Sequence, residues 1–198
     1  MRAATVILVL IAAMLVAQTV LANWYTGNSR TSAYGIKADI YTPSSAPYLA
    51  ADGESNWVSI PTPDWVQTGW YYRVGFSSAK PYVEHQVGQN YGLTDYGTQS
   101  WNTSKNYKVE YSSANNTWRA YIDNDFKEGW GPISAPKTVL GRSEVHTSSS
   151  NELDTDFDNV YWKNSLGSWN LFDQDNFVEQ SPYDVEETQY YKYRCYGP

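Results

Sequence analysis

The chain has 198 residues and carries 14 basic against 21 acidic side chains, a formal net charge of −7. An acidic surface disfavours nucleic acid and anionic membranes, so we expect neither as a partner. The two histidines and one cysteine exclude a histidine-rich zinc site and a CxxC pair. The sequence also lacks a phosphate-binding glycine loop and a GxSxG elbow, so we expect no cofactor.

The first residues are typical of an export signal. Arg2 precedes an apolar run that ends in small or apolar residues at Ala22. The run is nearly long enough to cross a bilayer, so a retained anchor is the alternative. Cleavage after Ala22 would leave residues 23–198 as a single secreted, monomeric domain, no longer attached to a membrane. With Cys195 as its only cysteine, this domain would have no internal disulfide and would depend on its core.

Composition predicts an all-β domain. Nine tryptophans, 18 tyrosines and five phenylalanines stand among many Val, Thr and Ser residues. Aromatic and β-branched side chains suit a pleated, half-buried surface, and few segments keep a helical period. The predicted strands, in chain order, lie in residues 34–43, 56–60, 64–76, 80–88, 106–123, 141–149, 157–172 and 188–197.

Turn signals separate these strands. The segments 106–123 and 157–172 each predict a hairpin, turning at residues 115–116 and 164–167. A further turn is expected at residues 61–63, where two prolines flank Thr62. Closely spaced strands with polar turns and no helix between them predict a two-sheet antiparallel β-sandwich or jelly roll.

An acidic run precedes and enters one predicted strand. Glu152, Asp154, Asp156 and Asp158 occupy alternate positions, so in an extended chain their carboxylates share one face. Several oxygen ligands on one face make Asp154, Asp156 and Asp158 candidates for binding Ca²⁺. A solvated acidic edge that opposes aggregation explains the run more simply, so we assign no metal.

A glutamine stands within the most aromatic predicted strand, residues 64–76. Gln67 shares one side of that strand with Trp65 and Gly69. A buried amide satisfied by neighbouring strands is the structural explanation for such a residue. A functional amide is the alternative.

Three segments resemble the core of the glutamic peptidases, the eqolisins. They are "SNWVSI…WVQTGW", "PYVEHQ" and "RSEVHTSSSNELDTDFDNVYW". Their order and spacing are similar to the family pattern, with Gln67 17 residues before Glu84 and 77 before Glu144. The resemblance implies a concanavalin A-like sandwich and an acid-active, secreted endopeptidase with a polypeptide substrate.

The same resemblance implies roles for individual residues. Gln67 would donate hydrogen bonds to the tetrahedral oxyanion, and Glu144 would act as general base on water and then as acid toward the leaving amine. Glu84 would be a supporting carboxylate, and Trp57 and Trp65 would wall the cleft. His85 and His146 are expected on the surface.

The sequence leaves a second class of function open. A fold does not fix a function, and a relative that lost catalysis would keep the scaffold. Exposed aromatic rings can stack on sugars, so a non-catalytic module that binds polysaccharide, or a structural protein of the cell surface, is the alternative.

Overall fold

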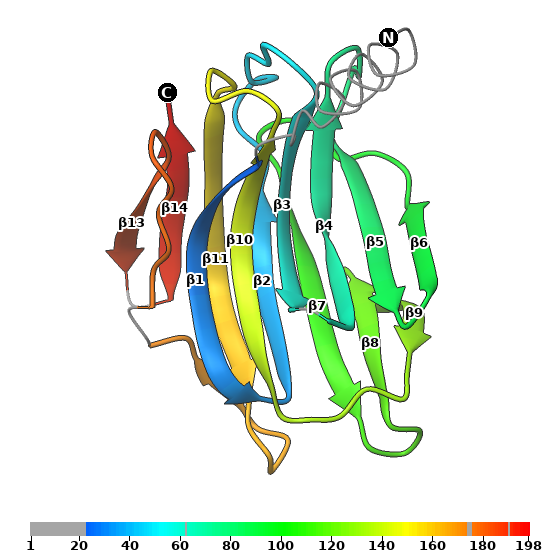
Figure 1. Cartoon of the computed structure of the whole chain (residues 1–198). Helices are drawn as coiled ribbons and strands as arrows, with labels where there is room; N and C mark the ends of the chain where they lie inside the picture. Colours follow the sequence, from blue (N-terminus) through cyan, green and yellow to red (C-terminus); the bar gives the residue numbers. More distant parts are fainter. Residues whose placement is uncertain (1–22, 62, 174–175, 190) are drawn as a thin grey trace, which may run out of the picture.

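The structure, a computed structural model, describes residues 23–198 except 62, 174–175 and 190. The expected signal peptide, residues 1–22, lies outside the described residues, as does Thr62 of the expected turn. Within the described part every regular element is a β-strand (Figure 1), which confirms the all-β prediction. That part contains no helix able to cross a bilayer.

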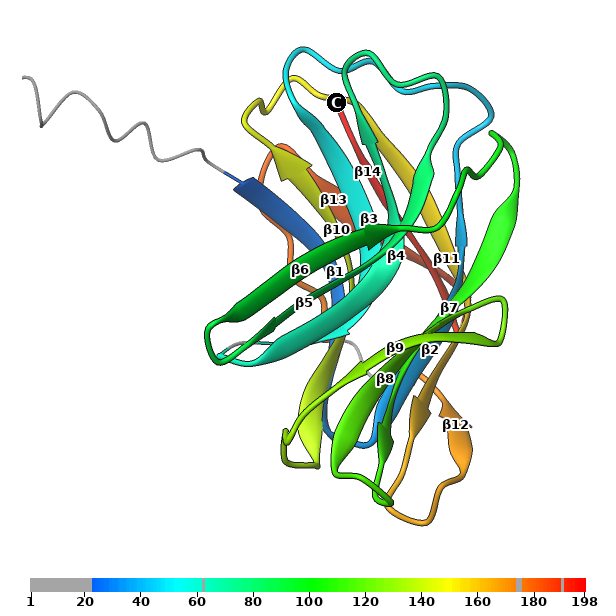
Figure 2. The same cartoon turned by 90° about the vertical axis from the view of Figure 1, so that its right-hand side faces the viewer.

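The strands form two antiparallel layers, which are seen edge-on in Figure 2. The first sheet has six strands in the order β1-β10-β3-β4-β5-β6. They are β1 (Asn23–Ala33), β10 (Lys137–His146), β3 (Gly53–Ile60), β4 (Trp65–Arg73), β5 (Lys80–Val87) and β6 (Asn90–Asp95). This six-stranded sheet carries the candidate site described below.

The second sheet has eight strands, in the order β13-β14-β11-β2-β7-β8-β9, with β12 added beside β11. They are β13 (Asp184–Gln189), β14 (Lys192–Gly197), β11 (Leu153–Lys163), β2 (Gly35–Tyr41), β7 (Ser104–Ser112), β8 (Thr117–Ile122), β9 (Asp125–Trp130) and β12 (Trp169–Leu171). Two packed antiparallel sheets confirm the predicted sandwich.

The main core fills the space between the sheets. Alternating residues supply it: Ile36, Ala38 and Ile40 of β2 are fully buried against residues such as Val58 and Val66 of the facing sheet. Removing this apolar surface from water is the main stabilising contribution, at roughly 25 cal/mol per Å². The core also holds Cys195 of β14, a free and fully buried thiol.

A second, smaller cluster lies on the other face of the six-stranded sheet, here called the outer face. It contains Trp57, Tyr71, Tyr82 and Leu140. Because both faces of the central strand β3 are covered, all eight of its residues are buried. Buried aromatic side chains therefore lie in two places, the core between the sheets and this outer cluster.

The acidic run forms the start of β11. Asp154, Asp156 and Asp158 alternate with the buried Leu153, Thr155 and Phe157, as the pattern predicts. Asp154 pairs with Arg194 at 2.7 Å and Asp158 with Lys192 at 3.5 Å. The described residues bring together no group of three acidic, histidine or cysteine side chains that could hold a metal ion.

Candidate active site

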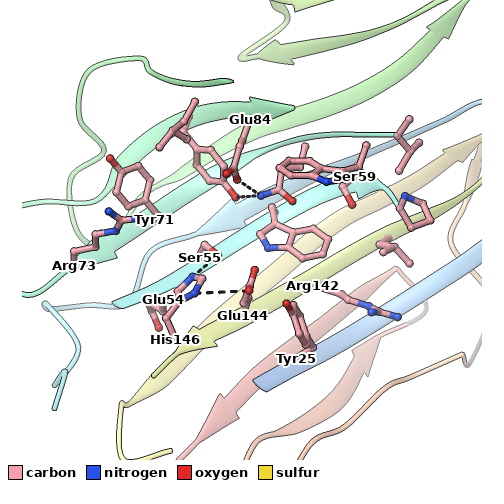
Figure 3. A pocket seen from close by; sticks show the side chains of 18 residues that line it. Tyr25, Glu54, Ser55, Ser59, Tyr71, Arg73, Glu84, Arg142, Glu144 and His146 are labelled. Atoms are coloured by element: carbon pink, nitrogen blue, oxygen red, sulfur yellow. Dashed lines mark hydrogen bonds and ion pairs between the residues drawn. The ribbon is translucent and has the colours of Figure 1, made fainter. Parts of the chain in front are cut away.

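The predicted site residues meet on the outer face of the six-stranded sheet. Trp57, Trp65, Gln67, Glu84 and Glu144 all line one cavity of about 450 Å³. They come from β3, β4, β5 and β10, strands that lie side by side in the sheet. In Figure 3 the side chains of Glu84 and Glu144 lie on opposite sides of the cavity. The structure therefore brings together residues that are far apart in the sequence.

Gln67 is held by two neighbours on β5. It lies directly opposite Glu84 in the β4–β5 ladder. Its amide nitrogen donates to Oε2 of Glu84 at 2.6 Å and to the Tyr82 hydroxyl at 3.0 Å. These bonds fix the orientation of the amide, with its nitrogen toward the carboxylate.

The next two residues explain why this segment reads "QTG". Thr68 points into the core, where its hydroxyl donates to the Tyr82 carbonyl at 2.8 Å. A Cβ at Gly69 would lie 1.9 Å from the Asn56 carbonyl oxygen of β3. Only glycine lets the two strands approach this closely. The motif therefore places Gln67 on the outer face, while Thr68 and Gly69 hold β4 close to its two neighbouring strands.

The pKa of Glu84 is shifted by burial and by its neighbours. Its Oε1 accepts a hydrogen bond of 2.6 Å from the hydroxyl of Tyr91, whose pKa rises to about 12 chiefly because of that bond. Burial raises the pKa of Glu84, and the negative charge of Glu144 adds to the rise, while the bonds from Tyr91 and Gln67 oppose it. Glu84 thus stays protonated to a higher pH than an ordinary glutamate.

Glu144 is held from the edge strand β1. The side-chain amide of Asn23 donates to its Oε1 at 2.7 Å. The ring nitrogen Nδ1 of His146 lies 3.7 Å from the same oxygen. Tyr25 stands directly opposite Glu144 in the β1–β10 ladder. This carboxylate therefore has a neutral donor and a titratable neighbour beside it.

His146 also contacts Ser55. Its Nε2 lies 3.3 Å from the Ser55 hydroxyl, so serine, histidine and Glu144 follow one another in a chain of contacts. The step of 3.7 Å from His146 to Glu144 is longer than a hydrogen bond. His146, which was expected on the surface, is half-buried and lines the cavity. His85 is half-buried too, stacked on Trp130 with ring centroids 4.1 Å apart.

Tyr82 links the two sides of the cavity. Burial raises the pKa of its hydroxyl well above the ordinary value, and the charges of Glu84 and Glu144 both raise it further. On one side of the cavity is the oriented amide of Gln67. On the other side is the carboxylate of Glu144, which accepts a hydrogen bond from Asn23. This set can bind a developing oxyanion and can accept a proton from water.

The strongest signal that sequence reasoning missed lies on β10 itself. Alternation places Arg142, Glu144 and His146 on one face of that strand. The contribution of Asn23 has no local signal, because it comes from β1, 121 residues before Glu144.

Comparison with known proteins identifies the fold. No protein-family model matches the sequence, and no curated protein matches it. Among solved structures, the chain superposes on scytalido-glutamic peptidase bound to a peptide-based transition state analog with a TM-score of 0.67 and 14% identity. The match covers 89% of this chain and 98% of that one. The chain thus has the concanavalin-like sandwich fold of the eqolisins.

A second eqolisin supports this assignment. SCP-B, solved in complex with the tripeptide Ala-Ile-His, gives a TM-score of 0.60 at 13% identity, again over 89% of this chain and 98% of the other. The likeness between this chain and the glutamic peptidases is therefore one of structure.

Proposed function

We propose that this protein is a secreted, acid-acting endopeptidase of the glutamic type. The observation that carries the proposal is the shared cavity: the Gln67 amide, oriented by Glu84 at 2.6 Å, and the Glu144 carboxylate open onto the same space. Hydrolysis by an activated water, with no metal or nucleophilic side chain, uses a general base and a donor to the oxyanion, and a carboxylate and an amide can fill these two roles.

In this proposal Glu144 acts on water. Its carboxylate accepts a proton as the water oxygen bonds to the peptide carbonyl carbon, and the carbonyl oxygen becomes an oxyanion. The amide nitrogen of Gln67 donates to that oxyanion, which takes the place of the Tyr82 hydroxyl as its partner. Glu144 then returns the proton to the leaving amine as the C–N bond breaks.

Glu84 favours reaction in acid. Because burial raises its pKa, it becomes neutral while the pH is still above the ordinary glutamate range. A neutral Glu84 does not repel the oxyanion that forms beside Gln67. As the pH rises and Glu84 ionises, that repulsion grows, so turnover should fall.

A peptide is the substrate best supported by the fold. The two eqolisins that resemble this chain were solved with a peptide-based transition state analog and with a tripeptide. A sugar platform built on tryptophan has less support, because all nine tryptophans lie in the described residues and none of them is exposed. Trp65 contributes instead to the wall of the cavity, edge-on to Tyr91 with centroids 6.4 Å apart.

The direct test is cleavage of an unfolded protein between about pH 2 and 6, a range around the ordinary glutamate pKa. The wild-type protein should cut, and Glu144→Gln should abolish cutting while the domain stays folded by circular dichroism. Glu187→Gln, on the exposed edge strand β13, is the matched control and should cut normally. A folded wild-type protein that cuts nothing in this range, or an active Glu144→Gln, would refute the proposal.

A further inference from the structure

Arg142 is a cation without a counter-ion in the cavity. It lines the cavity on β10, two residues before Glu144. Arg30, Arg73 and Arg194 each pair with an aspartate. By contrast, no ion pair among the described residues includes Arg142, and its buried Nε has no hydrogen-bond partner. A partly buried cation left unpaired is costly, so the site favours an anion from outside the protein.

A second unpartnered donor stands next to it. Trp57 lies directly opposite Arg142 in the β10–β3 ladder. Trp57 is 5% exposed, and its Nε1, also buried, has no hydrogen-bond partner within the described part of the chain. An indole Nε1 can only donate. Two adjacent side chains of the cavity therefore both lack an acceptor.

The backbone makes room for the arginine. Gly27 of β1 has φ +144°, and a Cβ there would lie 2.9 Å from Cγ of Arg142. The stem of Arg142 therefore lies against β1, and burial lowers the pKa of its guanidinium. A lowered pKa means that burial opposes the charged form, which a bound anion would stabilise.

Arg142 lies close to the proposed reaction centre. In Figure 3 the Tyr25 ring lies between Glu144 and Arg142. Burial raises the pKa of Tyr25; Glu144 raises it further and Arg142 opposes the rise, so both charges act on one hydroxyl. A peptide held at Glu144 would thus place a neighbouring group within reach of Arg142.

We propose that Arg142 and Trp57 form a subsite for a carboxylate of the peptide substrate. This inference rests on the proposed peptidase function and names its substrate class, peptides with a carboxylate near the cleaved bond. The planar guanidinium suits a carboxylate because it can donate two parallel hydrogen bonds. The carboxylate can belong to an aspartate or glutamate side chain or to the C-terminus of the peptide.

Binding to the inactive variant Glu144→Gln tests the subsite without turnover. Four peptides of one sequence are compared at about pH 6, where an ordinary carboxyl is ionised. One carries an internal glutamate and an amidated end, the second glutamine at that position and an amidated end, the third glutamine and a free end, and the fourth lysine and an amidated end. Affinity is followed by calorimetry.

The two carboxylate sources give different patterns. If the subsite takes a side chain, the glutamate peptide should bind about tenfold or more tightly than its glutamine counterpart, as expected for hydrogen bonds between charged groups. If it takes the C-terminus, the free-ended peptide should show that advantage. Equal affinity of all the peptides overturns the assignment.

Variants at Arg142 check the source of the preference. Arg142→Met keeps the length of the side chain and should reduce the preference to within about twofold, and Arg142→Glu should shift it to the lysine peptide. Arg194→Met, far from the cavity on β14, should leave the preference unchanged. A carboxylate preference that survives Arg142→Met refutes the subsite.

The two proposals fail in different ways. If wild-type protein cleaves an amidated, neutral peptide but Glu144→Gln shows no carboxylate preference, only the subsite falls. If wild-type protein neither binds nor cleaves any of the peptides while folded, the peptidase function falls with it.

Discussion

Gln67 and Glu84 are direct cross-strand neighbours, and the amide nitrogen of Gln67 donates to Oε2 of Glu84 at 2.6 Å. Oε2 of Glu84 accepts from this nitrogen, so it fixes which end of the amide faces the carboxyl group. An amide already held in one orientation needs only to exchange the Tyr82 hydroxyl for the oxyanion, and a prepared donor of this kind favours strong electrostatic stabilisation. The pair therefore makes Gln67 a prepared donor.

Gln67→Ala should reduce kcat by about 10²–10³-fold with a small change in KM, because the lost bonds form chiefly in the transition state. Steady-state kinetics on a single fluorogenic peptide separate the two parameters. Gln86→Ala is the control, since the amide of Gln86 on β5 donates to the Gly88 carbonyl, outside the cavity. A rise in KM at constant kcat would assign Gln67 to ground-state binding instead.

Tyr91→Phe should act through Glu84. The change removes the 2.6 Å hydrogen bond that opposes protonation of Glu84, so the pKa of Glu84 should rise further. The alkaline limb of the pH–rate profile should then move to higher pH, because Glu84 becomes neutral earlier as the pH falls. Tyr96→Phe is a matched control, since Tyr96 donates to Glu128 away from the cavity. An unshifted profile would contradict the proposed role of Glu84.

Ser55→Ala should retain most of the activity, because water rather than Ser55 is the proposed nucleophile. A sulfonyl fluoride should likewise leave the wild-type protein active and unlabelled. The contact of 3.3 Å between Ser55 and His146 makes this test necessary. Covalent labelling at Ser55, with loss of activity in Ser55→Ala, would show that the chain of contacts through His146 is a catalytic triad.

Glu54→Gln should flatten the pH dependence of stability. The carboxyl group of Glu54 is buried, and burial, together with the charges of Glu152 and Asp154, raises its pKa well above the ordinary value, while Asn56 opposes the rise. When the pKa of a group is higher in the folded state than in the unfolded state, protonation of that group stabilises the fold. This stabilisation is fully present below the unfolded pKa, about 4.3 for glutamate, and is lost as the pH rises through the folded-state pKa.

Wild-type protein should therefore lose stability as the pH rises above about 4.3, and Glu54→Gln should lose less. Thermal melts across this range measure the difference, at about 2–4 °C in Tm per kcal/mol for a domain of this size. Glu187→Gln, exposed on β13, should melt like the wild type. Parallel pH curves for wild type and Glu54→Gln would exclude this origin of acid stability.

Alternation and composition allowed the sandwich to be predicted from the sequence, whereas the site residues were implied by the resemblance of three segments to the glutamic peptidases. The alternating pattern of β2 and of the β7–β8 hairpin follows directly from their burial. The pattern did not predict β1, β6, β9 or β13, because the sequence of β1 does not alternate and the other three are short, largely polar strands. These strands lie at the edges of the two sheets, where a strand has only one neighbour and these sequences are too polar or irregular for hydrophobic periodicity to mark them.

The partners of the catalytic candidates depend on tertiary pairing. Glu84 and Gln67 come from adjacent strands, so their meeting follows from one hairpin. Asn23 reaches Glu144 because β1 pairs with β10, although 121 residues separate the two side chains in the sequence. No local pattern contains that information, since it depends on which strands share an edge.

Because the thiol of Cys195 is buried, the rate at which it is chemically modified can measure how often β14, the last strand, opens. Burial raises the pKa of Cys195 to about 12, and the thiolate is the form that reacts with disulfide reagents. Folded protein should therefore resist such reagents, and the rate of modification under native conditions should report how often β14 detaches from β11. A lone cysteine shielded in this way cannot crosslink two folded copies, so oxidation would select only molecules that have already opened.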